Sequence, residues 1–229
     1  MQKLSRFNPT LNFTVLISWL LILQLSLLLD PKIFLWLNGS FSIDWLNPFW
    51  IKLFGLLNHR LETKLNLLLA AVLNFVGLFQ YRKNPTVFRK ISWQLLFFWI
   101  GFQLFFTLQD WFFNSYLRLV HLSPSLVIQP AIKLSIVLQN TQIKDASYHS
   151  FPSGHAFSML YWGLFSAYLM RPTLAKISLF LAFFFSLPRI FSGAHWVSDV
   201  VFSMFLAFLC FLISRYAIEK YLGRIRRSQ

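Results

Sequence analysis

Charged residues are scarce in this chain of 229 residues: they make up only 12% of it, and just 7 are acidic. Hydrophobic residues account for 57%, including 28 Phe and 9 Trp. This composition excludes an ordinary soluble domain, in which about a quarter of the residues are charged. The sequence therefore predicts an integral membrane protein.

Cysteine is nearly absent as well. Cys210 is the single one and lies within an apolar run, so an internal disulfide is excluded and cysteine usage says nothing about the redox compartment. Internal repeats, low-complexity tracts and shifts of composition are also lacking. We therefore interpret residues 1–229 as one membrane domain.

The formal net charge of +14 arises because 21 Lys and Arg outnumber the few acids. The sequence lacks the continuous basic face or arm of a nucleic-acid-binding protein, because its basic residues flank apolar stretches. Lys and Arg collect in the cytoplasmic loops of membrane proteins and also contact anionic headgroups. The charge thus predicts the lipid bilayer as a partner and no nucleic acid.

Six apolar segments approach the roughly 20 residues that a transmembrane helix needs. The first follows Lys3 and Arg6 but lacks a small-residue cleavage site before the Asp30-Pro31 turn, so we expect a retained helix and not a signal peptide. The expected fold class is all-α, a polytopic membrane protein of about six transmembrane helices. These lie near residues 11–29, 64–81, 93–113, 155–171, 174–191 and 196–214.

Two stretches are expected outside the bilayer core. Residues 31–60 alternate aromatics with Asn, Gly and Asp, which predicts one or two short helices at the interface, where Trp is enriched. Residues 114–154 form the longest polar connection, and loops of this length in a compact domain are commonly functional. We expect this loop to form part of the active site.

The distribution of Lys and Arg predicts the orientation. With the N-terminus in the cytoplasm, 13 of the 21 basic residues fall on the cytoplasmic side. The other 8 are spread through longer loops, whose charges have less influence on the orientation. Both termini are therefore expected inside, with the 114–154 loop facing out.

Two clusters place ionisable residues where a membrane protein usually avoids them. The first, residues 150–155 with the sequence Ser-Phe-Pro-Ser-Gly-His, precedes an apolar run that begins at Ala156. A helix start with Pro, Ser and Gly leaves N–H groups that attract an anion. His155 in the first turn is then placed to protonate an oxygen of that anion as a general acid.

The second cluster runs from Arg189 to Asp199, with His195 six residues after the Arg. On a helix, His195 and Asp199 would share one face, so that the carboxylate holds one imidazole nitrogen and the other acts as a nucleophile. The planar guanidinium of Arg189 suits phosphate. Each residue alone has an ordinary explanation as a headgroup contact, but an Asp inside an apolar helix marks a functional site by default.

Pro152-Ser153-Gly154-His155 followed by Arg189, His195 and Asp199 resembles the second and third signature motifs of the type 2 phosphatidic acid phosphatase superfamily, which includes vanadium haloperoxidases. The resemblance implies a haloperoxidase-like helical bundle and a lipid phosphatase or phosphotransferase.

The same resemblance assigns roles to individual residues. His195 would attack phosphorus to give a phosphohistidine with the support of Asp199, and His155 would protonate the leaving oxygen. Phosphate oxygens would be bound by side chains and backbone of both motifs, namely Arg189, Ser153 and Gly154.

The family's first motif, a Lys followed after six residues by Arg-Pro, is missing. One register places Ser123-Pro124 at the Arg-Pro position and Tyr116 at the Lys position. Arg118 and His121 are then the nearby basic substitutes and join the expected phosphate-binding residues.

A second register pairs Lys133 with Asn140-Thr141. We prefer the first register because it keeps Pro124 and a usual spacing to Pro152. Fewer cations then clamp the phosphate, which bears on catalytic efficiency and not on reaction class.

A closer resemblance covers most of the chain and joins it to the bacterial lipid A 1-diphosphate synthase branch. It implies transfer of phosphate from undecaprenyl pyrophosphate to lipid A 1-phosphate at the periplasmic face of the inner membrane. The residues that carry it are Ser123-Pro124-Ser125-Leu126, Lys144-Asp145-Ala146-Ser147, Pro188-Arg189 and Gly193-Ala194-His195-Trp196.

Two other interpretations stay open. Ser153-Gly154 make the second motif more phosphatase-like, which allows simple hydrolysis of undecaprenyl pyrophosphate, phosphatidylglycerol phosphate, phosphatidate or lipid A. The missing first motif allows a catalytically silent lipid-binding relative.

Neither a metal nor another cofactor is expected, because Asp199 is the only acid near the predicted site and hard cations prefer several oxygen ligands. Cationic side chains and helix N–H groups can stabilise the equatorial oxygens of a phosphoryl transition state.

Overall fold

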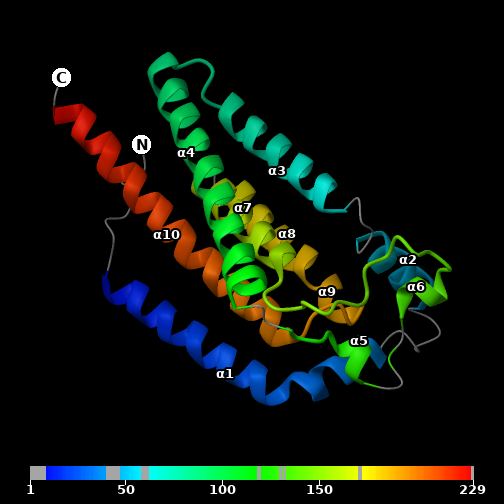
Figure 1. The fold of residues 1–229 in the computed structure, drawn as a ribbon. Coiled ribbons are helices and arrows are strands. Elements are labelled where there is room, and N and C mark those ends of the chain that lie inside the picture. Colours follow the sequence, from blue (N-terminus) through cyan, green and yellow to red (C-terminus); the bar gives the residue numbers. More distant parts are fainter. Residues whose placement is uncertain are drawn as a thin grey trace.

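The computed structural model describes residues 9–39, 47–57, 62–117, 120–128, 131, 133–169 and 172–227. This part of the chain folds into helices and their connections (Figure 1), which confirms the all-α class. Arg118, one of the predicted phosphate-binding residues, lies outside the described residues.

Each of the six apolar segments predicted from the sequence falls on a helix. Four stretches of the described residues are long and apolar enough to cross a membrane: Ile17–Asn38, Pro85–Tyr116, Thr173–Phe191 and Val197–Lys220. The chain is therefore a membrane protein, whereas the number of six spans stays a prediction. The six helices are α1 (Pro9–Gly39), α3 (Glu62–Phe79), α4 (Pro85–Asp110), α7 (Gly154–Leu169), α8 (Pro172–Ser186) and α10 (Val197–Arg227).

Shorter helical elements connect the long helices. The π-helical turn η2 (Trp111–Tyr116) extends α4, and α9 (Pro188–Phe191) follows α8 directly. The other short helices are α2 (Asn47–Leu57), α5 (Pro124–Val127) and α6 (Leu134–Val137).

The predicted turn at Asp30-Pro31 is not formed. α1 continues through Pro31 to Gly39, so residues 31–39 belong to a long helix and not to an interfacial segment. Proline removes one backbone hydrogen bond, but packed neighbours in a membrane bundle can satisfy the freed group. The added turns form because they pack against the protein: Phe34 is fully buried.

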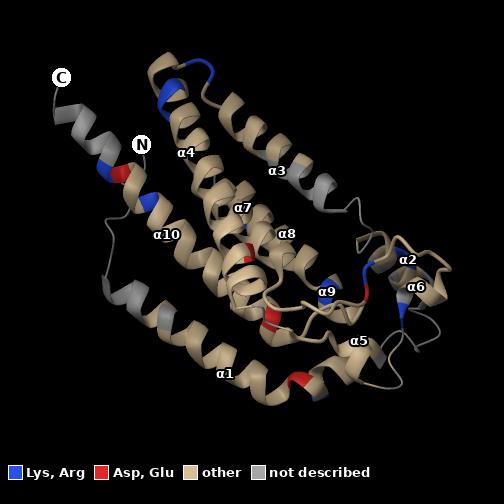
Figure 2. Cartoon of the chain, viewed as in Figure 1, with Lys and Arg blue, Asp and Glu red and all other residues tan. Residues whose placement is uncertain are grey.

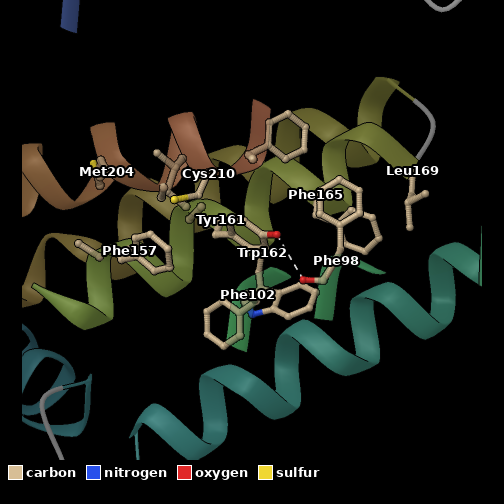
Figure 3. Packing of buried hydrophobic residues seen from close by; sticks show 14 of the residues in the cluster. Phe98, Phe102, Phe157, Tyr161, Trp162, Phe165, Leu169, Met204 and Cys210 are labelled. Carbon is tan, nitrogen blue, oxygen red and sulfur yellow. Dashed lines mark hydrogen bonds between the residues drawn. The ribbon is translucent and has the colours of Figure 1, made fainter. Parts of the chain in front are cut away.

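Aromatic side chains fill the centre of the bundle, where α4, α7 and α10 meet (Figure 3). The ring of Phe98 lies 4.1 Å from that of Phe165 and 5.7 Å from that of Phe211, measured between centroids. The buried hydroxyl of Tyr161 donates to the Phe98 carbonyl at 3.3 Å, so this polar group is satisfied within the apolar core.

α7 is the central helix and is packed on several sides, by α3, α4, α8 and α10. It approaches α8 closely at Gly163, where a Cβ atom would lie 2.5 Å from that of Ala182. Small residues permit such close helix pairs in membranes. The second sequence motif is therefore anchored at the start of the most enclosed helix.

The two ends of the bundle differ in the elements that form them and in the charged residues that they carry. α9 and the beginning of α10 lie at one end, beside α5 (Figure 1). The α3–α4 connection lies at the other end, and Figure 2 shows basic residues there and in the first turns of α4. The predicted active-site residues of the third motif are thus far from this basic end.

Candidate active site

His195 is held at both ring nitrogens in the turn between α9 and α10. Nδ1 lies 2.5 Å from the Ser150 carbonyl oxygen, which can only accept, so Nδ1 carries the proton. Nε2 lies 3.4 Å from Nη2 of Arg189, which can only donate. Neutral His195 therefore points the lone pair of Nε2 toward Arg189, as a nucleophile requires.

The surroundings of His195 keep its ring neutral. Burial lowers the pKa of His195 well below its usual value of 6.5, and the positive charge of Arg189 lowers it further. The Ser150 carbonyl opposes this shift in pKa by accepting a hydrogen bond from the ring. Because the net shift is downward, the neutral ring prevails at neutral pH.

This shift in pKa predicts the acid side of the pH profile. A lowered folded-state pKa extends the neutral form of His195 to lower pH, so kcat/KM should hold through pH 6.5 and fall only below it. The measurement is kcat/KM between about pH 4 and pH 8, with the substrate's own phosphate titration followed by phosphorus NMR as the control. An acid limb above pH 6.5 that the substrate does not explain would contradict a neutral His195.

Arg189 is turned toward His195 by its own contacts. It comes from the short helix α9 and is buried. Nη1 donates to the Lys144 carbonyl at 3.5 Å, and Nη2 approaches Nε2 of His195. A guanidinium fixed in this way presents N–H groups to an oxyanion next to Nε2. The structure thus brings together the Arg and His that the motif spacing paired.

Ser153 and Gly154 form the start of α7. Ser153 is fully buried, and its Oγ accepts from the backbone N–H of Ala156 at 3.4 Å, which is the arrangement of a helix N-cap. A Cβ atom on Gly154 would lie 3.2 Å from Cε2 of Phe106, so the site tolerates little bulk here. These two predicted residues shape the helix terminus whose N–H groups can face an anion.

His155 lies in the first turn of α7, as predicted. Its Nε2 donates to the Phe185 carbonyl of α8 at 2.7 Å. It is also close enough to His195 that the electrostatic interaction between the two rings lowers the pKa of His195. The structure therefore groups His155, Arg189 and His195 in one site.

Asp199 does not make the hydrogen bond that its spacing from His195 suggested. Oδ2 lies 3.9 Å from Nδ1 of His195, because that nitrogen is already bonded to the Ser150 carbonyl. Oδ2 instead accepts from the backbone N–H of Trp196 at 2.9 Å, which caps the start of α10. Asp199 therefore faces Nδ1 of His195 across 3.9 Å without a direct hydrogen bond to it.

Ser150 connects His195 with His121. Its Oγ lies 2.7 Å from Nδ1 of His121, and the same nitrogen lies 3.5 Å from Oδ1 of Asp199. His121 thus occupies the Nδ1 side of His195, whereas Arg189 occupies the Nε2 side. The phosphate-binding role expected of His121 stays a prediction. The role of Ser150 could not be predicted from the sequence, because a backbone carbonyl leaves no signal in residue type.

The segment around Ser123-Pro124 contacts Ser147, just before the second motif, and Gly193 of the third motif. Ser123 N–H donates to the Ser147 carbonyl and Ser123 Oγ accepts from Ser147 N–H, both at 2.9 Å. Ser125 N–H donates to the carbonyl of Gly193 at 3.2 Å. Gly193 has a φ of +75°, and a Cβ atom there would lie 2.9 Å from that of Ser125, so this contact requires glycine.

Lys133, the basis of the other register, lies just before α6. Its carbonyl accepts from the N–H groups of Ile136 and Val137, both at 3.1 Å, and α6 packs against α2. The choice of the register that uses Ser123-Pro124 stays a prediction.

The expectation that Asp199 is the only acid near the site is wrong. Asp30 of α1 is buried and accepts hydrogen bonds from the backbone N–H of Ser198, at 2.9 Å, and from its hydroxyl. Asp30 and Ser198 are far apart in the sequence, so only the packing of α1 against α10 could show this pairing.

Comparisons with known proteins agree with the motifs. Residues 128–222 match the model of the PAP2 superfamily. Over 82 residues the chain is 34% identical to the lipid A 1-diphosphate synthase of Escherichia coli (strain K12), a match that covers 34% of this chain and only 33% of that protein. No solved structure matches the chain significantly. The resemblance predicted from the motifs is therefore confirmed for residues 128–222. The closer resemblance was expected to cover most of the chain, but the match to the lipid A 1-diphosphate synthase covers 34% of it.

Proposed function

We propose that this chain is a membrane enzyme that cleaves a phosphate-ester or pyrophosphate bond of a lipid through a phosphohistidine at His195. One observation carries the proposal: the lone pair of Nε2 on a buried, neutral His195 faces Arg189 at 3.4 Å. The PAP2 superfamily match supports the same chemistry.

The first step forms a bond from Nε2 of His195 to phosphorus while the bond from phosphorus to the leaving oxygen breaks. Arg189 binds the phosphoryl oxygens with its N–H groups, as the start of α7 does with backbone N–H groups. The Nδ1 proton stays on the ring, donated to Ser150. The imidazole therefore becomes positive, and the charge of Asp199, 3.9 Å from Nδ1, stabilises it.

His155 supplies the proton that the leaving oxygen takes up. Because its Nε2–H is donated to the Phe185 carbonyl, we place the transferred proton on Nδ1. In the second step, an oxygen of water or of a lipid phosphate attacks phosphorus and the bond to Nε2 breaks, so that its electron pair returns to Nε2 and His195 is neutral again. With water, Nδ1 of His155 takes up the released proton; with an ionised lipid phosphate oxygen no proton is released, and His155 regains its proton from solvent.

His155→Ala should therefore have an effect that depends on the leaving group. We expect kcat/KM to fall by about a hundredfold for a lipid monophosphate, whose alkoxide leaving group needs a proton. The loss should shrink for more acidic leaving groups, such as nitrophenol. The measurement is a linear free-energy plot of kcat/KM against leaving-group pKa for both proteins. Parallel plots would show that His155 is not the acid.

We further propose that the phosphoryl group passes from undecaprenyl pyrophosphate to lipid A 1-phosphate. The similarity to a lipid A 1-diphosphate synthase supports this choice over the other lipids. The test uses the purified full chain in nanodiscs with undecaprenyl pyrophosphate labelled at its terminal phosphate, with and without lipid A 1-phosphate.

The three interpretations give different products in this assay. Label in lipid A supports transfer, and label released only as inorganic phosphate indicates hydrolysis. A folded protein that turns over neither this donor, phosphatidylglycerol phosphate nor phosphatidate would instead be a silent lipid-binding relative, and the proposed reaction would be wrong.

We also propose that the site faces the periplasm of a bacterial inner membrane, with both termini in the cytoplasm. The basic α3–α4 end lies opposite the end that holds α9 (Figure 2), as the enrichment of Lys and Arg on the cytoplasmic side leads us to expect.

This orientation can be measured with single cysteines in a Cys210→Ser background. A membrane-impermeant maleimide should label Tyr148→Cys in intact spheroplasts, because Tyr148 is exposed at the site end. Lys83→Cys in the exposed α3–α4 turn should react only after the membrane is opened. The reverse pattern would place the active site in the cytoplasm.

A further inference from the structure

One face of α1 contacts the segment that holds the third motif. Asp30, Phe34 and Asn38 are spaced by four residues, so they lie above one another on the helix. All three are buried, with 8%, 0% and 3% of their surface exposed. Buried polar residues at two of these positions are unusual in a membrane helix and call for a reason.

Each of the three contacts a different point of residues 191–198. Asp30 accepts two hydrogen bonds from Ser198. The ring of Phe34 lies 6.2 Å from that of Trp196, edge to face. Nδ2 of Asn38 donates to the Phe191 carbonyl at 2.9 Å. The contacts therefore span the whole turn from α9 to α10.

This turn needs support from outside because it contains little regular structure. It consists of the four-residue helix α9 and an irregular stretch through Gly193, whose φ is +75°. It nevertheless holds Arg189 and His195 at 3.4 Å from each other. Catalytic groups must be held within fractions of an ångström of their working positions, and the residues packed behind them usually hold them there.

Asp30 is the charged member of this face. Its carboxylate lies at the N-terminus of α10, where backbone N–H groups carry partial positive charge. The same helix start is capped from within by Asp199. One carboxylate from each of two helices therefore fixes the beginning of α10, directly after His195.

We propose that α1 is part of the catalytic apparatus and that Asp30 is a positioning residue, which holds the turn from Arg189 to Asp199 through Ser198. The proposal deepens the proposed function and rests on it for its activity readout. Asp30 lies outside residues 128–222, which match the PAP2 superfamily.

The test compares full-length variants in nanodiscs: Asp30→Ala, Asp30→Asn, Ser198→Ala and the double variant Asp30→Ala/Ser198→Ala. Ser26→Ala is the matched control, because Ser26 is also a buried polar residue of α1 but its hydroxyl bonds to Leu23 of the same helix. Two readouts are taken on the folded fraction: kcat and KM for lipid phosphate release, and hydrogen–deuterium exchange of peptides covering 189–199.

We expect Asp30→Ala to lower kcat by ten- to a hundredfold with KM changed less than threefold, and to speed exchange in 189–199. Asp30→Asn keeps an acceptor for Ser198 N–H and should recover part of kcat. The double variant should be no worse than Asp30→Ala, because both changes remove one interaction. Ser26→Ala should stay within twofold of the wild type.

The outcomes separate this inference from the proposed function. Faster exchange at 189–199 in Asp30→Ala, with a wild type that releases no phosphate, supports the positioning role and contradicts the enzyme. The positioning role is overturned if the wild type is active, Asp30→Ala keeps more than half of the wild-type kcat, and exchange in 189–199 is unchanged. If Asp30→Ala does not fold, Asp30→Asn and Ser198→Ala decide the question by the same two readouts.

Discussion

His195→Ala should abolish phosphate release from every lipid substrate, with a loss in kcat of more than about a thousandfold. The variant lacks Nε2, the atom that accepts the phosphoryl group in the proposed mechanism and that lies 3.4 Å from Nη2 of Arg189. Alanine is small and apolar, so it leaves helix insertion unchanged. The measurement is phosphate release in nanodiscs together with detection, after an alkaline quench, of a base-stable, acid-labile phosphoprotein.

His149→Ala is the matched control for this experiment. His149 is exposed and lies next to Ser150, in the same segment, where its N–H bonds to Ser147. We expect it to keep activity within twofold and to form the same phosphoprotein. Residual activity of His195→Ala above a tenth of the wild type would rule out the nucleophile assignment.

Parts of the fold that rest on composition and motif spacing could be predicted from the sequence. The apolar segments fall on helices because about 20 apolar residues have few other ways to satisfy their backbone in a bilayer. The approach of Arg189 to His195 also follows from local spacing, since six residues of short helix and turn bring them together.

Contacts that join distant segments could not be predicted in this way. The hydrogen bond from His195 goes to a backbone carbonyl of Ser150, which every residue type possesses. The i,i+4 spacing predicts Asp199 as the hydrogen-bond partner of the His195 ring. Spacing within one segment cannot show that the Ser150 carbonyl, from another loop, takes this position. Asp-Pro usually favours a turn, so the sequence likewise predicts one at Asp30. Tertiary packing overrides this preference, and α1 continues through Pro31.

Arg189→Gln and Arg189→Lys should differ, and the difference tests what the guanidinium contributes. Lysine keeps the charge but presents a single ammonium in place of the planar fork. We expect Arg189→Lys to lower kcat/KM by about a hundredfold, or roughly 2.7 kcal/mol of transition-state stabilisation. Arg215→Lys is the matched control, since Arg215 pairs with Glu219 in the later part of α10, and it should stay within twofold.

Glutamine removes the charge as well as the fork, so Arg189→Gln should lower kcat/KM by about a thousandfold or more. It should also move the acid limb of the pH profile. The positive charge of Arg189 lowers the pKa of His195, so its removal raises that pKa and protonates the nucleophile at higher pH. The acid limb of the kcat/KM profile should therefore lie at higher pH in Arg189→Gln than in the wild type, whereas in Arg189→Lys it should stay close to the wild type. Equal limbs in the two variants, measured on the same lipid substrate, would show that Arg189 does not act on His195 through its charge.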